Sequence, residues 1–178
     1  MNHPSISTKR LVLTPYEMGD VDELYRVMSN PQVMQHIGTG SLTWTEVRDI
    51  VVRTIDRWNE IGMGWWTIRR QEDRYLMGQI CLRPEQDLPH EVAVGYGLDS
   101  AFWRQGYARE ALEAVVAYGF TERSLRRIVA IVRSENAASC ALLERCRFVR
   151  EPDVLIRGKR RCLYAISGRR PQAGPISP

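Results

Sequence analysis

The hydrophobic pattern is most informative between residues 91 and 123. Residues 91–98 alternate between larger apolar side chains and small ones, which predicts a β-strand. After residue 107 the apolar positions recur at helical spacing; they are Ala108, Ala111, Leu112, Val115, Val116, Gly119 and Phe120. Gly106 therefore lies where a strand and a turn give way to a helix.

The same patterns predict elements along the rest of the chain. Strands are expected at 10–14, 65–69, 76–82, 127–133 and 161–167, with a short extended segment at 148–149. Asp20 with Glu23, and Thr43 with Glu46, have the spacing of capping boxes that open two helices. Residues 32–42 are expected to form a loop, and 136–145 a further helix.

This order of elements predicts an α/β or α+β fold, with helices packed on the faces of a sheet. The strands on either side of the Gly106 helix should be parallel neighbours, because a strand–helix–strand crossover requires it. One domain is expected over 1–167, and a disordered tail over 168–178, which is rich in glycine and proline.

The stretch around Gly106 has the features of an anion site. The first amides of a helix have no partner within the helix, and its dipole places positive charge there. Glycine allows a ligand to approach the backbone, and a phosphate is the usual guest. Arg104 and Arg109 flank the helix start, where the dipole disfavours cations unless an anion neutralises both. A simple glycine turn before an amphipathic helix is the alternative interpretation.

Composition narrows the function classes only partly. A net charge of +4 suits polyphosphates, nucleic acid or acidic surfaces alike. No recognised nucleic-acid motif is present, so a nucleic-acid-binding domain is the weakest interpretation. The cysteines lack metal-ligand spacing, so no metal site is expected. No apolar stretch approaches the ~18 residues of a membrane span, and the polar start of the chain lacks a signal core, so we expect a cytoplasmic protein.

Five segments together resemble the GNAT N-acetyltransferases, and within them the RimJ/RimL-like branch. They lie in the family's order at 8–15, 30–34, 94–98, 103–111 and 136–148. The likeness covers about residues 8–167. Two positions depart from the family pattern. Trp103 stands where the wider superfamily has Gln or Arg, and Arg147 stands where a glycine usually ends the second helix, so its backbone is expected to be mildly strained.

The resemblance implies a single-domain GNAT fold, in which a mixed, mostly antiparallel sheet splays into a V between its fourth and fifth strands. It also implies that acetyl-CoA, the acetyl donor, binds in the V. The pantetheine would pair with the backbone of Tyr96, Gly97 and Leu98. The pyrophosphate would lie on the helix start, whose residues are Arg104, Gln105, Gly106, Tyr107, Ala108 and Arg109. Asn136 would hold the cofactor arm, with a helix N-cap as its alternative role.

Two catalytic roles follow from the chemistry of acetyl transfer to an amine. The amine must be neutral, and the leaving thiolate must be stabilised. By resemblance, Ser139 lies near the sulfur and can return a proton to the thiolate. Glu91 is the candidate base, because it shares a strand face with Ala93, Gly95 and Gly97 and can act on the amine directly or through water. In the family, the carboxylate of this strand usually falls closer to the position of Ala93. A solvated Glu91 is the alternative, and Tyr107 is a second candidate base.

The acceptor pocket is expected to come from the early helices and loops. Its predicted walls are His36, Trp44, Trp65 and Trp66, with core packing as the alternative for each tryptophan. The predicted function is transfer of an acetyl group from acetyl-CoA to a primary amine, on a protein N-terminus or a small molecule. A non-catalytic acyl-CoA-binding regulator of the same fold is the alternative, and a homodimer is compatible with either.

Overall fold

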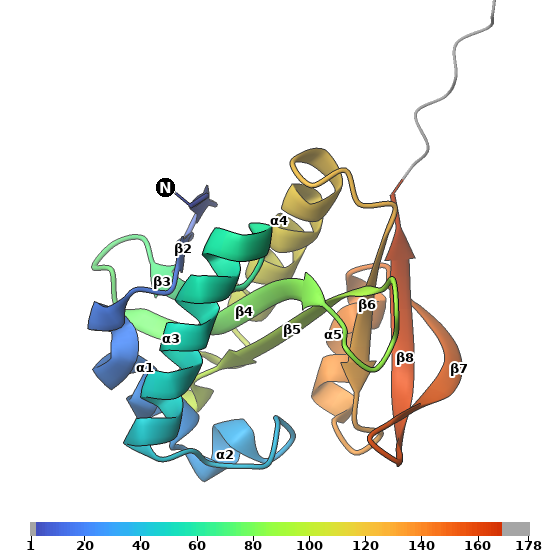
Figure 1. The fold of residues 1–178 in the computed structure, drawn as a ribbon, viewed down its shortest axis with the longest axis horizontal. Coiled ribbons are helices and arrows are strands. Elements are labelled where there is room, and N and C mark those ends of the chain that lie inside the picture. The colour runs from blue at the N-terminus through green and yellow to red at the C-terminus, as the bar shows by residue number, and fades with distance from the viewer. Residues whose placement is uncertain (1–2, 169–178) are drawn as a thin grey trace, which may run out of the picture.

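Eight strands form one sheet in the order β1-β2-β3-β4-β5-β6-β8-β7 in the computed structural model, which describes residues 3–168 (Figure 1). The strands are β1 (Ile6–Ser7), β2 (Leu11–Pro15), β3 (Trp65–Arg70), β4 (Leu76–Pro84), β5 (Val92–Leu98), β6 (Arg127–Val132), β7 (Val149–Ile156) and β8 (Lys159–Ser167). Only β5 and β6 pair in parallel; the other pairs are antiparallel. This is the mixed sheet that the sequence predicts.

The helices lie on both faces of the sheet. They are α1 (Val21–Met28), α2 (Pro31–Met34), α3 (Trp44–Ile61), α4 (Tyr107–Thr121) and α5 (Ala137–Arg145), with 3-10 turns η1 (Met18–Asp20) and η2 (Ser100–Phe102). One apolar cluster joins α1, α2 and the start of α3 to one face. A larger cluster packs α4 and α5 against the other face. The early helices α1 to α3 and the later helices α4 and α5 thus pack mainly on opposite faces of the sheet.

Local sequence rules explain most helix ends. The predicted capping box of α3 is present: the Thr43 hydroxyl accepts a bond from the Glu46 N–H, and a Glu46 carboxylate oxygen accepts one from the Thr43 N–H at 2.7 Å. The capping box predicted for Asp20 and Glu23 is wrong. Both carboxylates instead receive bonds from the Arg69 guanidinium on β3, at 2.7 and 2.6 Å. The Asp20 carboxylate also accepts a bond from the Glu17 N–H at 2.8 Å, so its local capping bond begins η1 and not α1.

Two further predictions need correction. Asn30 caps a short helix, α2, inside a stretch expected to be mostly loop. Strand β7 extends to Ile156, although only 148–149 was expected to be extended, because a bulge between Glu151 and Val154 breaks its alternation. The predicted disordered tail lies outside the described residues except for Gly168, whose N–H donates to the Arg126 carbonyl at 3.0 Å.

Candidate active site

Strands β5 and β6 pair at one end and diverge at the other (Figure 1). Their ladder has a single registered pair, Ala93 with Val129. The Asp99 N–H donates back to β4 at 2.8 Å, so odd-numbered residues of β5 direct their backbone groups towards β4. The backbone groups of Tyr96 and Leu98 therefore face the gap, beyond the end of the ladder. An extended ligand can pair there as an added strand.

Trp103 anchors the turn that leads from this gap to α4. Its indole Nε1–H donates to the Leu98 carbonyl at 2.8 Å. The residue that departs from the superfamily pattern thus has a definite structural role. The Trp103 indole also occupies the Leu98 carbonyl, which is one of the hydrogen-bonding groups at the gap. The groups left for a ligand are the Tyr96 N–H, the Tyr96 carbonyl and the Leu98 N–H.

The start of α4 is shaped for an anion. Gly106 is its N-cap residue with φ of 81°, a left-handed conformation that suits glycine, and no side chain of the described residues caps the helix. The first helical bond, from the Glu110 N–H to the Gly106 carbonyl, is 3.1 Å long. Arg104 is also left-handed, with φ of 60°. Successive turns of this kind point backbone N–H groups into one concavity.

Arg10 supports this loop, although the sequence pattern gave no sign of it. Its guanidinium donates to the Glu110 carboxylate at 2.7 Å and to the Gln105 carbonyl at 3.0 Å, and it lies 4.3 Å from the centre of the Tyr107 ring. Partial burial works to raise the pKa of Glu110, but the bonds from Thr8 and Arg10 hold that pKa below its ordinary value. Arg10, which directly precedes β2, thereby fixes the loop from about a hundred residues away in sequence.

The two arginines predicted at the helix start differ in their surroundings. Arg109 pairs with Glu113 one turn further along α4, with Nε and Oε1 2.8 Å apart, and its side chain is more than half exposed. Arg104 is exposed at the turn. A phosphate contact from Arg109 would therefore compete with an existing ion pair.

Tyr96 carries the most distinctive polar group of the gap. Its hydroxyl is buried and has no hydrogen-bond partner among the described residues. Burial raises the pKa of Tyr96 to about 12, and the neighbouring Ser139 hydroxyl opposes that rise only in part. The phenol is therefore protonated at neutral pH. It lies next to α5, the helix that carries Ser139. A buried hydroxyl without a partner is costly, which is typical of a site completed by a ligand.

Asn136 takes the N-cap role that was its alternative. Its side-chain oxygen accepts a bond from the Ser139 N–H at 3.2 Å and begins α5. The predicted departure at Arg147 is present as a left-handed residue with φ of 66°, after which the Phe148 N–H donates to the Leu143 carbonyl at 3.0 Å. This is a Schellman-type helix end built without glycine.

The opposite face of β5 is lined by apolar groups from the early part of the chain. A Cβ added at Gly97 would lie 2.8 Å from Ile37 Cδ1, and one added at Gly95 would lie 3.4 Å from Cys81 Sγ and 4.0 Å from the Trp65 ring. The close approach of Ile37 requires glycine at position 97, whereas the contacts at position 95 leave room for a Cβ. Burial raises the pKa of Cys81 to about 11, so this thiol is neutral at physiological pH.

Glu91 is not brought together with the other predicted site residues. It precedes β5 at the closed end of the strand pair, roughly 16 Å along the strand from Tyr96 at about 3.3 Å per residue. The Arg127 guanidinium donates to its carboxylate at 3.0 Å and also to Glu151 at 2.6 Å. The carboxylate is therefore engaged in an ion network that joins three strands.

The residues predicted to line the acceptor pocket do not all lie together. Trp65 lies on the Gly95 face, but the next residue, Trp66, points to the opposite face and is fully buried between Trp58 and Tyr118. Neighbours in a strand alternate in this way, so Trp66 belongs to the core beneath α4 and its predicted place in the pocket wall is wrong. Trp44 is 45% exposed and donates to Asp22 at 2.7 Å.

His36 lies in the turn after α2, next to Ile37. The turn is closed by a bond of 3.0 Å from the Ile37 N–H to the Met34 carbonyl. Its position near Gly97 keeps His36 among the candidate pocket residues.

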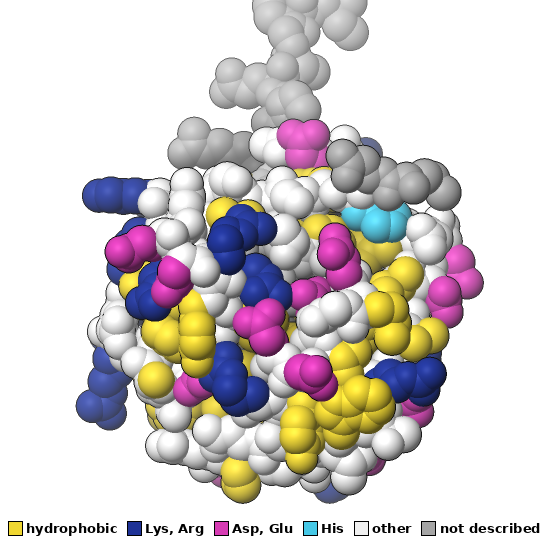
Figure 2. Space-filling view, turned by 90° about the vertical axis from the view of Figure 1, so that its left-hand side faces the viewer, with side chains coloured by type: hydrophobic (Ala, Val, Ile, Leu, Met, Phe, Trp, Pro, Cys, Tyr) yellow, Lys and Arg dark blue, Asp and Glu magenta, His cyan; other side chains and the backbone are white. Residues whose placement is uncertain are grey.

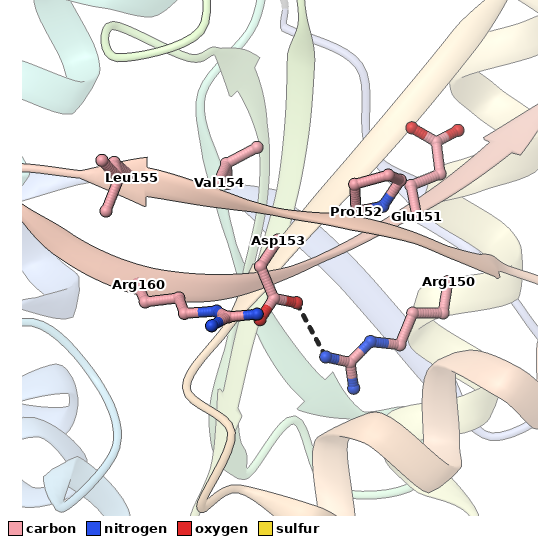
Figure 3. A pocket seen from close by; sticks show the side chains of 7 residues that line it. All are labelled: Arg150, Glu151, Pro152, Asp153, Val154, Leu155 and Arg160. Carbon is pink, nitrogen blue, oxygen red and sulfur yellow. Dashed lines mark hydrogen bonds and ion pairs between the residues drawn. The ribbon is translucent and has the colours of Figure 1, made fainter.

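A hollow far from this gap lies beside the bulge of β7 (Figure 3). Arg150 and Arg160 converge on Asp153 there, with Arg150 and Asp153 2.7 Å apart. The lining comes entirely from the β7–β8 hairpin and shares only Glu151, a partner of Arg127, with the candidate-site residues described above. Ion pairing within the hairpin accounts for this arrangement.

Charge and composition of the surface also bear on function. Basic and acidic side chains intermingle on the face shown in Figure 2, without a patch of one sign. This view agrees with pairs such as Arg69 with Asp20 and Arg70 with Asp73.

Within residues 3–168, no group of His, Cys, Asp or Glu side chains is arranged to hold a metal ion. None of the helices described is both long and apolar enough to cross a membrane.

The diverging parallel pair of β5 and β6, connected by the helix α4 that begins at Gly106, is the arrangement expected of a GNAT acetyltransferase. The family model described as an acetyltransferase (GNAT) domain matches residues 10–149. The chain belongs to this family. The uncharacterized N-acetyltransferase YoaA of Bacillus subtilis is 29% identical over 149 residues, which are 83% of this chain and 84% of that protein.

The solved structures that share the fold include two acetyltransferases. An acetyltransferase from Agrobacterium tumefaciens has a TM-score of 0.83 and 24% identity, covering 94% of this chain and 96% of its own. RimL, a ribosomal L7/L12 alpha-N-protein acetyltransferase in complex with coenzyme A, has a TM-score of 0.79 and 22% identity over 92% of this chain and 98% of its own. The predicted family and fold are confirmed, and the RimJ/RimL-like branch is compatible with them.

Proposed function

We propose that the protein transfers an acetyl group from acetyl-CoA to a primary amine in the gap between β5 and β6. The carrying observation is that the β5–β6 ladder ends at Ala93 and Val129, beside a helix start that no described side chain caps. A diphosphate fits the N–H groups at 105–109, and a pantetheine arm fits the free backbone groups of Tyr96 and Leu98. GNAT domains use this donor, which supports the assignment.

The Tyr96 phenol supplies the acid of the reaction in this proposal. When the amine nitrogen bonds to the thioester carbon, the carbon–sulfur bond breaks and the sulfur leaves as a thiolate. Tyr96 is protonated at neutral pH, buried and unpartnered, so its proton can pass to that sulfur. Ser139 lies beside the phenol and can restore the proton from solvent. The sequence predicts that Ser139 itself returns the proton to the thiolate, whereas this proposal gives that step to Tyr96 and the resupply of its proton to Ser139.

The amine reaches the thioester from the Ile37 and Trp65 face. Glu91, the predicted base, is bound to Arg127 and stands at the closed end of the pair, so we assign it to the ion network. Proton loss from the amine then falls to water or to His36, which lies in the turn over Gly97. The apolar lining favours the neutral amine, because burial disfavours an ammonium ion.

Isothermal titration with acetyl-CoA tests the donor site, and turnover against a panel of primary amines tests the reaction. The panel includes peptides with free N-termini, amino acids, polyamines and aminoglycosides. We expect micromolar to submillimolar binding of the donor and release of free thiol that depends on an amine. Absence of donor binding at millimolar concentration would sink the proposal.

A further inference from the structure

Arg133 bridges the two arms of the open strand pair on the acceptor side. It follows directly after β6, and its guanidinium donates to the Gln35 carbonyl at 3.2 Å and to the Gly38 carbonyl at 2.6 Å. Both carbonyls belong to the turn after α2, nearly a hundred residues earlier in the chain. A single side chain from the β6 arm thus holds a segment that packs on the β5 arm.

The turn that Arg133 binds, residues 35–38, packs directly on β5. Ile37 stands between the two carbonyls, and its Cδ1 rests on Gly97 so closely that an added Cβ would come within 2.8 Å. Val33, which belongs to α2, lies 3.9 Å from the same point. The turn itself is closed by bonds from the Ile37 N–H to the Met34 carbonyl and from the Gly40 N–H to the Ile37 carbonyl.

Arg133 is also connected to the donor side. Its own carbonyl accepts a bond of 2.9 Å from the N–H of Asn136, the residue that caps α5. Ser139, beside Tyr96, follows in the first turn of that helix. The residue that fastens the acceptor-side turn is therefore three positions from the start of the helix that lines the donor side.

We propose that Arg133 is a positioning residue that clasps the turn 35–38 across the strand pair and closes the acceptor side of the thioester site. The clasp places Ile37 over Gly97, excludes water from the thioester and shapes the entrance for the amine. This inference rests on the proposed function, since it takes the gap to be the site of acetyl transfer. Planar bidentate donation suits arginine for the role, because lysine offers no matching fork.

Hydrogen exchange of the substrate-free protein tests the clasp without activity. In Arg133→Met, which keeps length but cannot donate, the Ile37 and Gly40 amides should exchange about 10- to 100-fold faster, because two bonds that oppose opening are lost. Arg123→Met is the matched control: Arg123 tethers the Ile61 carbonyl at 3.1 Å at the end of α3, so its loss should leave these two amides unchanged. Unchanged exchange in Arg133→Met overturns the proposal.

Kinetics separate a positioning role from a purely structural one. Arg133→Met should raise acceptor-independent hydrolysis of acetyl-CoA and the KM for the amine several-fold, while the KM for acetyl-CoA stays within about twofold. Arg133→Lys, the variant to use if the methionine variant does not fold, should give smaller changes in the same direction. Faster exchange with hydrolysis and amine KM both unchanged also overturns the proposal. Failure of the wild-type protein to bind acetyl-CoA would instead refute the proposed function.

Discussion

The donor side and the acceptor side of the gap are built by different means. On the proposed donor side, one short stretch from β5 through Gly106 to α4 would supply most of the binding groups, and they belong to the backbone. On the acceptor side, the turn after α2, strand β3 and the end of β6 contribute side chains that lie far apart in sequence. Backbone groups are the same in every residue, so the donor side tolerates sequence change. The side chains that line the acceptor side can be exchanged without disturbing donor binding. This arrangement allows one donor site to serve different acceptors.

The largest expected effect comes from Gly106→Val on the donor side. Valine disfavours the φ of 81° that turns the first amides of α4 into the gap, and its side chain would meet the Arg10 guanidinium 3.3 Å from the new Cβ. We expect acetyl-CoA affinity to fall about 100-fold, or roughly 2.7 kcal/mol, measured by titration calorimetry.

Gly158→Val is the matched control for backbone strain. Gly158 has a similar φ of 72° in the β7–β8 turn, with open space around it. This variant should lose stability but keep donor affinity. Equal loss of affinity for acetyl-CoA in both variants would show that backbone strain, and not the free N–H groups at the start of α4, controls binding.

Tyr96→Phe tests whether the donor side also contributes chemistry. Removing the phenol should lower kcat about 10- to 100-fold, because the thiolate loses its acid, with the KM for acetyl-CoA nearly unchanged. Stability should hold or rise, since a buried hydroxyl without a partner is removed. Tyr164→Phe, which removes a hydroxyl bonded to Glu144, is the comparison. A kcat equal to that of the wild type in Tyr96→Phe would return the acid role to Ser139 alone.

The difference between the two sides also explains what the sequence could predict. The strand–glycine–helix stretch and the Asn136 helix follow from local periodicity, caps and turns, so their placement was accessible from residues within one window. The left-handed Arg147 was equally readable, because helix ends obey local geometry.

The acceptor side was not readable in the same way. Arg133 acts on the Gly38 carbonyl 95 residues away, and no local pattern encodes such a pairing. Arg10 is a similar case on the donor side, where it binds the distant Gln105 carbonyl. Trp65 and Trp66 are identical in type and adjacent, and only the pairing of β3 within the sheet decides which of them faces Gly95. Glu91 shares the predicted strand face, and the neighbouring strand 127–133 was predicted too, but no local pattern shows that Arg127 of that strand pairs with the Glu91 carboxylate.

Glu91→Gln tests whether its carboxylate belongs to the acceptor chemistry or to the fold. In the ion network it faces Arg127, so the variant should lose about 1 kcal/mol of unfolding free energy in chemical denaturation. The kcat should stay within about threefold of the wild type, against the 100-fold or greater loss expected for a general base. A loss of that size without a change in stability would restore Glu91 as the base.

The network should also respond to acid. The hydrogen bond from Arg127 lowers the folded-state pKa of Glu151, so its stabilisation is present above the ordinary glutamate pKa and is lost as pH falls through the lowered value. The stability difference between wild type and Glu151→Gln should accordingly shrink below about pH 4. A difference that is constant with pH would mean that the charge of Glu151 does not contribute.

The smallest expected effect is a gain, from Arg147→Gly at the end of α5. Arg147 holds φ of 66°, a conformation that costs an L residue about 1 kcal/mol and glycine almost nothing. Glycine also loses more chain entropy on folding, so the net gain should be about 0.5 kcal/mol by chemical denaturation. Arg145→Gly, two residues earlier within the helix, should destabilise by about 1 kcal/mol. If glycine at 147 destabilised the protein instead, side-chain contacts of Arg147 would outweigh the local rule by which the donor side is built.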